Sequence, residues 1–363
     1  MNKNRLLRRC SGVEGCWAFL DAVIVFLVIS LIASVIFAGF EEGSYGREIA
    51  SFIINIVIQL GFFFSAYQPN RFFNSHHTYT FTRPKLKQVL QGFVIAILSV
   101  AFFEAIALAF NYMLVSVGYI NKSFINMSSA LAIVFLVIQA VIFAPVCEEV
   151  LMRGSLLSSI GVMGKISEKW RTVFMVFTSG VFFALLHMNP MQTVYQFLFG
   201  ATLAYVTIRT GNIMTAVFAH AFNNTIGIVL SVPVIDNGIT AWIGGVFESG
   251  FAYLWVIISL LLVGVGFFVI RKVCRLFGKR TPEIIMREEN GKEHSENGGT
   301  MGGIILLVVA VAICVTMWIS VCVTSFIQAW HKAVEIENRA FFYGRNSFRV
   351  SPSTNETQQL FRA

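Results

Sequence analysis

The stretch Ala140-Val-Ile-Phe-Ala-Pro-Val-Cys-Glu-Glu-Val-Leu-Met-Arg153 places two glutamates and an arginine inside a long apolar run. An ionisable side chain in the hydrocarbon of a membrane costs roughly 3 kcal/mol or more, so such residues normally face a protein interior or a water-filled cavity. The charged positions in this run therefore predict a buried functional site.

The composition of the whole chain is that of a polytopic membrane protein. Of 363 residues, 56% are hydrophobic and 13% are charged, and the mean hydropathy is +0.73. About one quarter of the residues are charged in a soluble domain. Continuous apolar runs of about twenty residues predict spanning helices, because a spanning strand needs only about ten alternating residues. We expect an all-α fold whose nine spans begin near Cys16, Glu48, Gln88, Ser129, Arg171, Met191, Asn212, Phe251 and Gly302.

The chain divides into a membrane core and a C-terminal extension. Residues 1–275 are predicted to form an eight-helix transmembrane core, with the polar motifs inside 129–231. The polar, mixed-charge stretch 276–300 has the composition of a solvated linker. A ninth C-terminal transmembrane helix is expected at 301–328, followed by a polar tail at 329–363. The extension is a candidate binding site for a membrane protein partner.

Basic residues lie before the first span and in alternate loops, and they predict the orientation. Short loops rich in Lys and Arg stay on the cytoplasmic side, so we expect a cytoplasmic N-terminus. The net charge of +8 fits attraction to anionic membrane lipid and indicates no nucleic acid, since no soluble domain is predicted that could bind it. The basic clusters are Lys3–Arg9, Arg71–Lys87, Lys165–Arg171, Arg209 and Arg271–Arg280.

The spacing of the acids assigns them different roles. Glu149 and Arg153 are four residues apart and share a helix face, where they can neutralise each other. Glu148 is rotated by about 100° and lacks that partner. Apolar surroundings raise the proton affinity of a carboxylate, which suits a general base. The apolar residues after Arg153 predict that the helix continues and buries both acids; the alternative is a helix that ends at the surface with Arg153 snorkelling to the head groups.

Two further motifs follow on later apolar segments. His220 and Asn224 are four apart, so both should point into the same interior, where a structural interhelical hydrogen bond is the alternative role. His187 lies four residues after Phe183 and precedes Met-Asn-Pro, a sequence that ends helices. An ordinary interfacial histidine is the alternative interpretation of His187.

In this order, Glu-Glu-x-x-x-Arg, Phe-x-x-x-His and His-x-x-x-Asn on successive membrane helices resemble the CPBP family of CAAX-protease and bacteriocin-processing (Abi) intramembrane endopeptidases. The resemblance covers about residues 129–231 and is complete at every motif position. It implies an eight-helix core with the site in a polar cavity. It further implies that Glu148 and His187 activate water, that His220 and Asn224 stabilise the oxyanion, and that Glu149, Arg153 and Phe183 are structural.

The chemistry of peptide hydrolysis agrees with those roles. It needs a base for the water, donors for the oxyanion and an acid for the leaving amine. A catalytic zinc is an alternative, because Glu148, His187 and His220 would also satisfy a zinc ion with an exchangeable water. The chain contains no HExxH motif, and its six cysteines lack zinc-site spacing. We expect no tightly bound zinc.

The sequence thus predicts an intramembrane endopeptidase that cleaves a membrane-associated peptide or protein, by CAAX-type or bacteriocin-type processing, in the plasma membrane of a bacterium. One alternative is a non-catalytic membrane partner in bacteriocin immunity or sensor regulation. Another is a proton-coupled transporter, which also uses buried Glu, His and Asn. A transporter would line several spans with polar residues, whereas the other spans hold only scattered ones, at Asp21, Asn55, Glu104 and Asn111. Many transporters are also built from inverted repeats, and the sequence shows no internal repeat.

Overall fold

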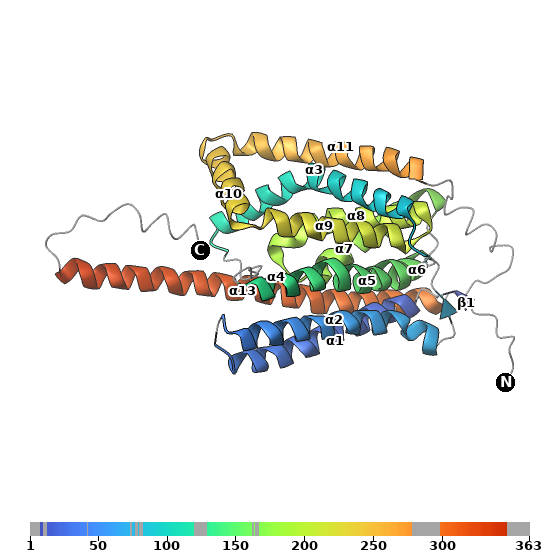
Figure 1. Cartoon of the computed structure of the whole chain (residues 1–363), viewed down its shortest axis with the longest axis horizontal. Coiled ribbons are helices and arrows are strands. Elements are labelled where there is room, and N and C mark those ends of the chain that lie inside the picture. Colours follow the sequence, from blue (N-terminus) through green and yellow to red (C-terminus); the bar gives the residue numbers. More distant parts are fainter. Residues whose placement is uncertain are drawn as a thin grey trace.

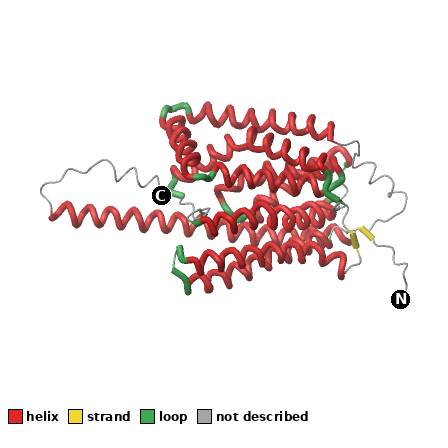
Figure 2. Tube along the Cα trace, viewed as in Figure 1, coloured by secondary structure: helices red, strands yellow, loops and turns green. Residues whose placement is uncertain are grey.

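The computed structural model is a bundle of long helices that lie side by side along one direction (Figure 1). Helix accounts for nearly all of the regular structure (Figure 2); the described strands are β1 (Arg8–Arg9) and β2 (Ser75–His76), which pair in parallel. The predicted all-α membrane fold is confirmed. The structure describes residues 8–9, 13–41, 43–72, 75–76, 79, 83–119, 129–161, 163, 167–277 and 298–346.

A helix occupies each of the nine predicted spans. Seven of the described helices are long and apolar enough to cross a membrane, whereas α7 and α8 are not counted among them. These two helices flank His187. Outside the motif helix, the elements are α1 (Glu14–Ala38), α2 (Tyr45–Phe72), α3 (Leu86–Ser116), α7 (Glu168–Leu186), the 3-10 helix η3 (Pro190–Gln192), α8 (Thr193–Thr210), α9 (Ile213–Leu230), α10 (Pro233–Glu248), α11 (Ala252–Phe277) and α13 (Gly298–Asn346).

The motif helix runs without a break from Ala130 to Ile160, and we use this name for that span. It therefore continues beyond Arg153, as the apolar residues predicted. One π-helical segment lies on each side of the glutamate pair, and neither was predicted from the sequence. The segments are α4 (Ala130–Val137), the π-helix η1 (Ile138–Phe143), α5 (Ala144–Glu149), the π-helix η2 (Val150–Leu156) and α6 (Leu157–Ile160).

Pro145 explains the position of the first π turn. Its ring removes a backbone donor and would break an ordinary helix. In η1 the Ala144 N–H donates to the Gln139 carbonyl, one residue further back than in an α-helix, and Pro145 then begins the next α segment. The wider turn carries the helix past the proline. Such π turns occur often at functional sites.

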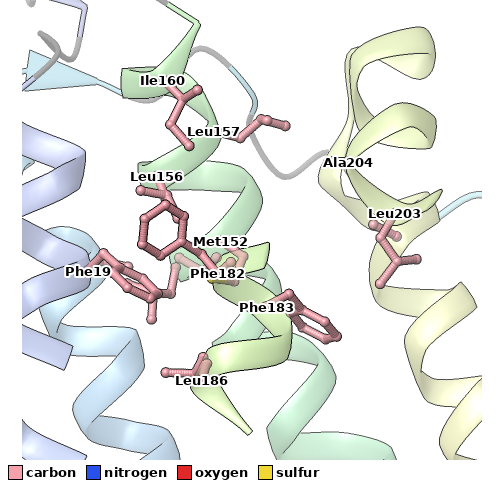
Figure 3. Packing of buried hydrophobic residues seen from close by; sticks show 14 of the residues in the cluster. Phe19, Met152, Leu156, Leu157, Ile160, Phe182, Phe183, Leu186, Leu203 and Ala204 are labelled. Atoms are coloured by element: carbon pink, nitrogen blue, oxygen red, sulfur yellow. The ribbon is translucent and has the colours of Figure 1, made fainter. Parts of the chain in front are cut away.

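The core lies where the second half of the motif helix packs against α1, α7 and α8. Aromatic and aliphatic side chains from these helices interdigitate there (Figure 3). Two glycines allow close approach. A Cβ at Gly15 of α1 would lie 2.2 Å from the Ser155 carbonyl oxygen, and a Cβ at Gly200 of α8 would lie 2.7 Å from the Phe183 Cβ. Small residues allow membrane helices to pack backbone to backbone in this way.

Two elements differ from the sequence prediction. The stretch between the seventh and eighth spans, expected to be a loop, contains α10, which runs across the ends of its neighbours (Figure 1). The ninth helix, expected at 301–328, is the longer α13 and takes in part of the predicted polar tail. Most of the predicted linker, at 278–297, and the end of the tail, at 347–363, lie outside the described residues.

Helix α13 packs against α1 and α7 and then projects beyond the bundle (Figure 1). Its Trp318 donates from Nε1 to the Thr193 hydroxyl at 3.0 Å. Thr193 in turn donates to the Asn189 carbonyl at 3.0 Å. The C-terminal extension is therefore hydrogen-bonded to the segment that directly follows His187.

Candidate active site

Glu149 is the centre of a buried polar cluster. Its Oε1 lies 3.0 Å from Nδ1 of His220 on α9 and accepts a hydrogen bond from Nη1 of Arg153 at 3.1 Å. Its Oε2 lies 3.1 Å from Arg153 Nε. Glu149 and Arg153 are fully buried, and His220 is 2% exposed. One carboxylate is thus shared between a guanidinium and an imidazole, which offsets the cost of burying all three.

Arg153 links the cluster to α7 and α8. Its Nη2 donates to the Gly200 carbonyl at 2.9 Å, and its guanidinium lies 4.6 Å from the centre of the Phe183 ring. The edges of the two imidazoles also meet this ring, with centroid distances of 4.8 Å to His187 and 5.6 Å to His220. Phe183 therefore fixes the spacing between the two histidines.

Glu148 is separate from this ion cluster. It is 7% exposed, and its Oε1 accepts a hydrogen bond at 3.0 Å from Nε2 of Gln59 on α2. Its Oε2 is buried and has no hydrogen-bond partner among the described residues. The two adjacent acids thus have different environments, as the helix geometry predicted: Glu149 is neutralised, and Glu148 meets a neutral amide.

His187 lies at the C-terminal end of α7 with its ring half-buried. Its Nδ1 lies 2.8 Å from the Phe183 carbonyl oxygen. A carbonyl can only accept, so Nδ1 carries the hydrogen and Nε2 carries the lone pair in the neutral ring. His187 also lies within electrostatic range of Glu148, His220 and Arg153. The three motifs therefore converge on one region of the bundle.

The turn after His187 is strained. Met188 has a φ of 47°, in the left-handed region that side chains disfavour. The helix stops there, as Met-Asn-Pro predicted, and the Asn189 side chain accepts from the backbone N–H of Met191 before η3 begins. Residues held in such conformations cluster at functional sites.

Asn224 faces the motif helix one turn beyond His220. Its Nδ2 donates at 2.7 Å to the carbonyl of Ala140 in η1. In the π register that carbonyl would accept from residue 145, but Pro145 has no N–H. The Asn224 amide therefore satisfies a carbonyl left without a backbone donor, and one of its two N–H groups remains for other partners.

The would-be metal ligands do not form a metal site in this arrangement. Among the described residues, no three His, Cys, Asp or Glu side chains group closely enough to hold an ion. Glu148, His187 and His220 share a region without meeting that condition.

Comparison with known proteins matches the segment that carries all three motifs. Residues 129–226 fit the Rce1-like family model, described as type II CAAX prenyl endopeptidase Rce1-like. The resemblance of the motif segment to the CPBP family is thus confirmed. A Bacillus subtilis (strain 168) protein named "Putative membrane peptidase YdiL" is 24% identical over 149 residues, which are 41% of this chain. The chain spans only 57% of that relative's length. No solved structure matches.

The CPBP segment supplies every predicted site residue, but α2 supplies one that was not predicted. Gln59 is a buried amide in an apolar span, the same kind of signal that singled out His220. Asn55 lies four residues before it, so the spacing that pointed to His220 and Asn224 is also present on α2 and could have identified Gln59. Asn223, next to Asn224, accepts a hydrogen bond from the Tyr195 hydroxyl of α8.

Proposed function

We propose that this protein is an intramembrane endopeptidase in which Glu148 and His187 activate water to hydrolyse a peptide bond. The observation that carries the proposal is the contrast between the adjacent acids. Glu149 is paired with Arg153 and His220, whereas Glu148 keeps a buried oxygen that lacks a hydrogen-bond partner in the described chain. A carboxylate without a counter-charge can take a proton from water.

The reaction begins when the water oxygen attacks the carbonyl carbon and the Glu148 carboxylate takes one water proton. The Nε2 lone pair of His187 accepts a hydrogen bond from the O–H that remains on this oxygen as the tetrahedral intermediate forms. The proton then passes from Glu148 to the leaving nitrogen as the C–N bond breaks. The products are a peptide with a new C-terminal carboxylate and a peptide with a new amine.

The oxyanion of the tetrahedral intermediate needs positioned donors. We assign this role to His220 and to the remaining N–H of Asn224. His220 donates its Nδ1–H to Glu149, so a doubly protonated ring is required for Nε2 to donate as well. That state balances the cluster, because Arg153 and the imidazolium offset the two glutamates. Buried charges are tolerated when they are compensated in this way.

The substrate we propose is a membrane-associated peptide or protein. A lipidated CAAX peptide is the first choice because the matched family model is named for CAAX prenyl endopeptidases. A bacteriocin-type peptide is the second. We also propose a bacterial plasma membrane location with the N-terminus in the cytoplasm, supported by the alternation of basic loops.

The test is cleavage by the full-length protein in lipid nanodiscs, using fluorescence-quenched farnesylated CAAX peptides and bacteriocin-leader peptides, with mass spectrometry to locate the cut bond. Glu148→Gln and His187→Ala should each lower the cleavage rate by at least about a hundredfold. Glu48→Gln is the matched control, since Glu48 is a carboxylate on α2 that accepts from Ser129. Parallel reactions with a chelator test metal dependence.

Two outcomes would oppose the proposal. Cleavage by Glu148→Gln at the wild-type rate would remove this residue as the base. Peptide binding without cleavage by the wild-type protein would favour the non-catalytic partner role instead.

A further inference from the structure

Gln59 of α2 lies against Glu148 although it is far outside the segment that matches the family model. Its Nε2 donates to Glu148 Oε1 at 3.0 Å, and Gln59 is 8% exposed. A carboxylate oxygen can only accept, so the amide nitrogen must face it. This contact also fixes where the amide oxygen points, because both atoms belong to one planar group.

Two oxygens remain at this contact. Gln59 Oε1 and Glu148 Oε2 are both buried, and neither has a hydrogen-bond partner in the part of the chain that the structure describes. Each is bonded to the same carbon as one of the two hydrogen-bonded atoms, so both oxygens lie beside this contact. Both are acceptors, so neither can satisfy the other. Buried acceptors of this kind are normally met by a donor, and water is the usual one.

We propose that Gln59 Oε1 and Glu148 Oε2 together hold the water molecule consumed in hydrolysis, an inference that rests on the proposed function. A water has two O–H groups and can donate one to each oxygen. Its lone pair then points away from both, towards an approaching carbonyl carbon. The proton on the Glu148 side moves to that carboxylate, and the other stays on the attacking oxygen, where it turns from Gln59 to the Nε2 lone pair of His187 as the tetrahedral intermediate forms.

Gln59 therefore has two functions that substitution can separate. Its N–H holds the Glu148 carboxylate in place, and its carbonyl oxygen orients the water. Gln59→Met keeps the length of the side chain and removes both functions. Gln59→Glu, when protonated, retains one O–H donor and one acceptor oxygen, and so restores part of each.

Gln68 is the matched control on the same helix. Its Nε2 donates to Asp21 at 2.7 Å, so it too is an α2 amide bound to a carboxylate of another helix. Gln68→Met removes this hydrogen bond and the one that Gln68 Oε1 accepts from Trp17 Nε1, both away from Glu148. Comparison of the two Met variants separates an effect on the site from an effect on the packing of α2.

The experiment measures kcat, KM and thermal unfolding for these variants in nanodiscs, with the peptide that the wild-type protein cleaves. We expect Gln59→Met to lower kcat by tenfold to a hundredfold, approximately, with KM nearly unchanged, because a misplaced water slows the chemical step alone. Gln59→Glu should recover part of the rate, and Gln68→Met should keep the wild-type kcat. A wild-type kcat in Gln59→Met would overturn the inference, and so would an equal loss of kcat in Gln59→Met and Gln68→Met. Neither outcome affects the proposed function, which the Glu148→Gln variant tests separately.

A second readout does not depend on activity. A high-resolution experimental structure of the full chain should show an ordered water within hydrogen-bond distance of Gln59 Oε1 and Glu148 Oε2. The same density should be lost in Gln59→Met. If no ordered water binds these two oxygens in the wild-type protein, the proposal is overturned even if the protein proves to be a peptidase.

Discussion

The Nδ1 atom of His220 lies 3.0 Å from the same Glu149 oxygen that accepts from Arg153. This contact joins α9 to the motif helix and places an imidazole beside a carboxylate whose charge is already balanced. Glu149 therefore has a counter-charge in Arg153 that does not depend on His220. A carboxylate used in this way is both a support for the fold and an electrostatic partner for the site.

Arg153→Met should destabilise the protein strongly. It removes the cation and leaves Glu149 buried with only His220 to compensate it, and breaking a buried pair from one side costs about 3–5 kcal/mol. Thermal unfolding in detergent should show a large decrease in Tm. Lys272→Met, at an exposed lysine on α11, serves as the control and should change Tm little. A Tm for Arg153→Met equal to that control would contradict the assigned role.

Asn224→Leu should cost about 1–3 kcal/mol of unfolding free energy, because it leaves the Ala140 carbonyl without its donor. Pro145→Ala restores a backbone N–H beside that carbonyl. The double variant should therefore lose less stability than the sum of the two single variants. Additive losses in this double-mutant cycle would show that the proline and the amide are not coupled.

Gly200→Ala should lower stability by about 1–3 kcal/mol through overpacking, since the added Cβ would lie 2.7 Å from the Phe183 Cβ. The backbone shift should also weaken the hydrogen bond from Arg153 to the carbonyl at this position. Gly245→Ala in α10 is the matched control, because nothing lies within 4 Å of the Cβ it would add. Unfolding measured by intrinsic fluorescence should separate the two variants, and equal values would refute the tight contact.

Trp318→Phe should slow cleavage by severalfold while leaving the fold intact. The variant loses the indole hydrogen bond to Thr193, and the Asn189 carbonyl then depends on a less constrained hydroxyl. Hydrogen exchange should rise at residues 187–193. Trp330→Phe, on the exposed part of the same helix, should change neither exchange nor rate. Unaltered exchange at 187–193 in Trp318→Phe would show that α13 does not support this turn.

The parts of the structure that follow from local periodicity could be predicted from sequence. The pairing of Glu149 with Arg153 is one example, because helix geometry alone brings residues four apart together. The shared direction of His220 and Asn224 is another, and both side chains do contact the motif helix.

The remaining features depend on contacts between distant segments. The π turn at Pro145 is compatible with the fold because an amide from α9 supplies the missing donor, and no local pattern reveals that donor. Gln59 acquires its role only when α2 packs beside Glu148. Helix α10 lies in a stretch without basic residues that was expected to be a loop, and Pro233 in its first turn is a local signal for a helix start.

Met188 has a further consequence for how His187 is presented. A glycine at this position would adopt the left-handed backbone without strain, yet the chain carries a methionine whose side chain is almost completely enclosed. Burial of the thioether thus stabilises a left-handed backbone conformation that is otherwise unfavourable for methionine. His187 is therefore next to a rigid turn and not next to a flexible hinge. We expect that another segment of the chain has to move when a substrate approaches it.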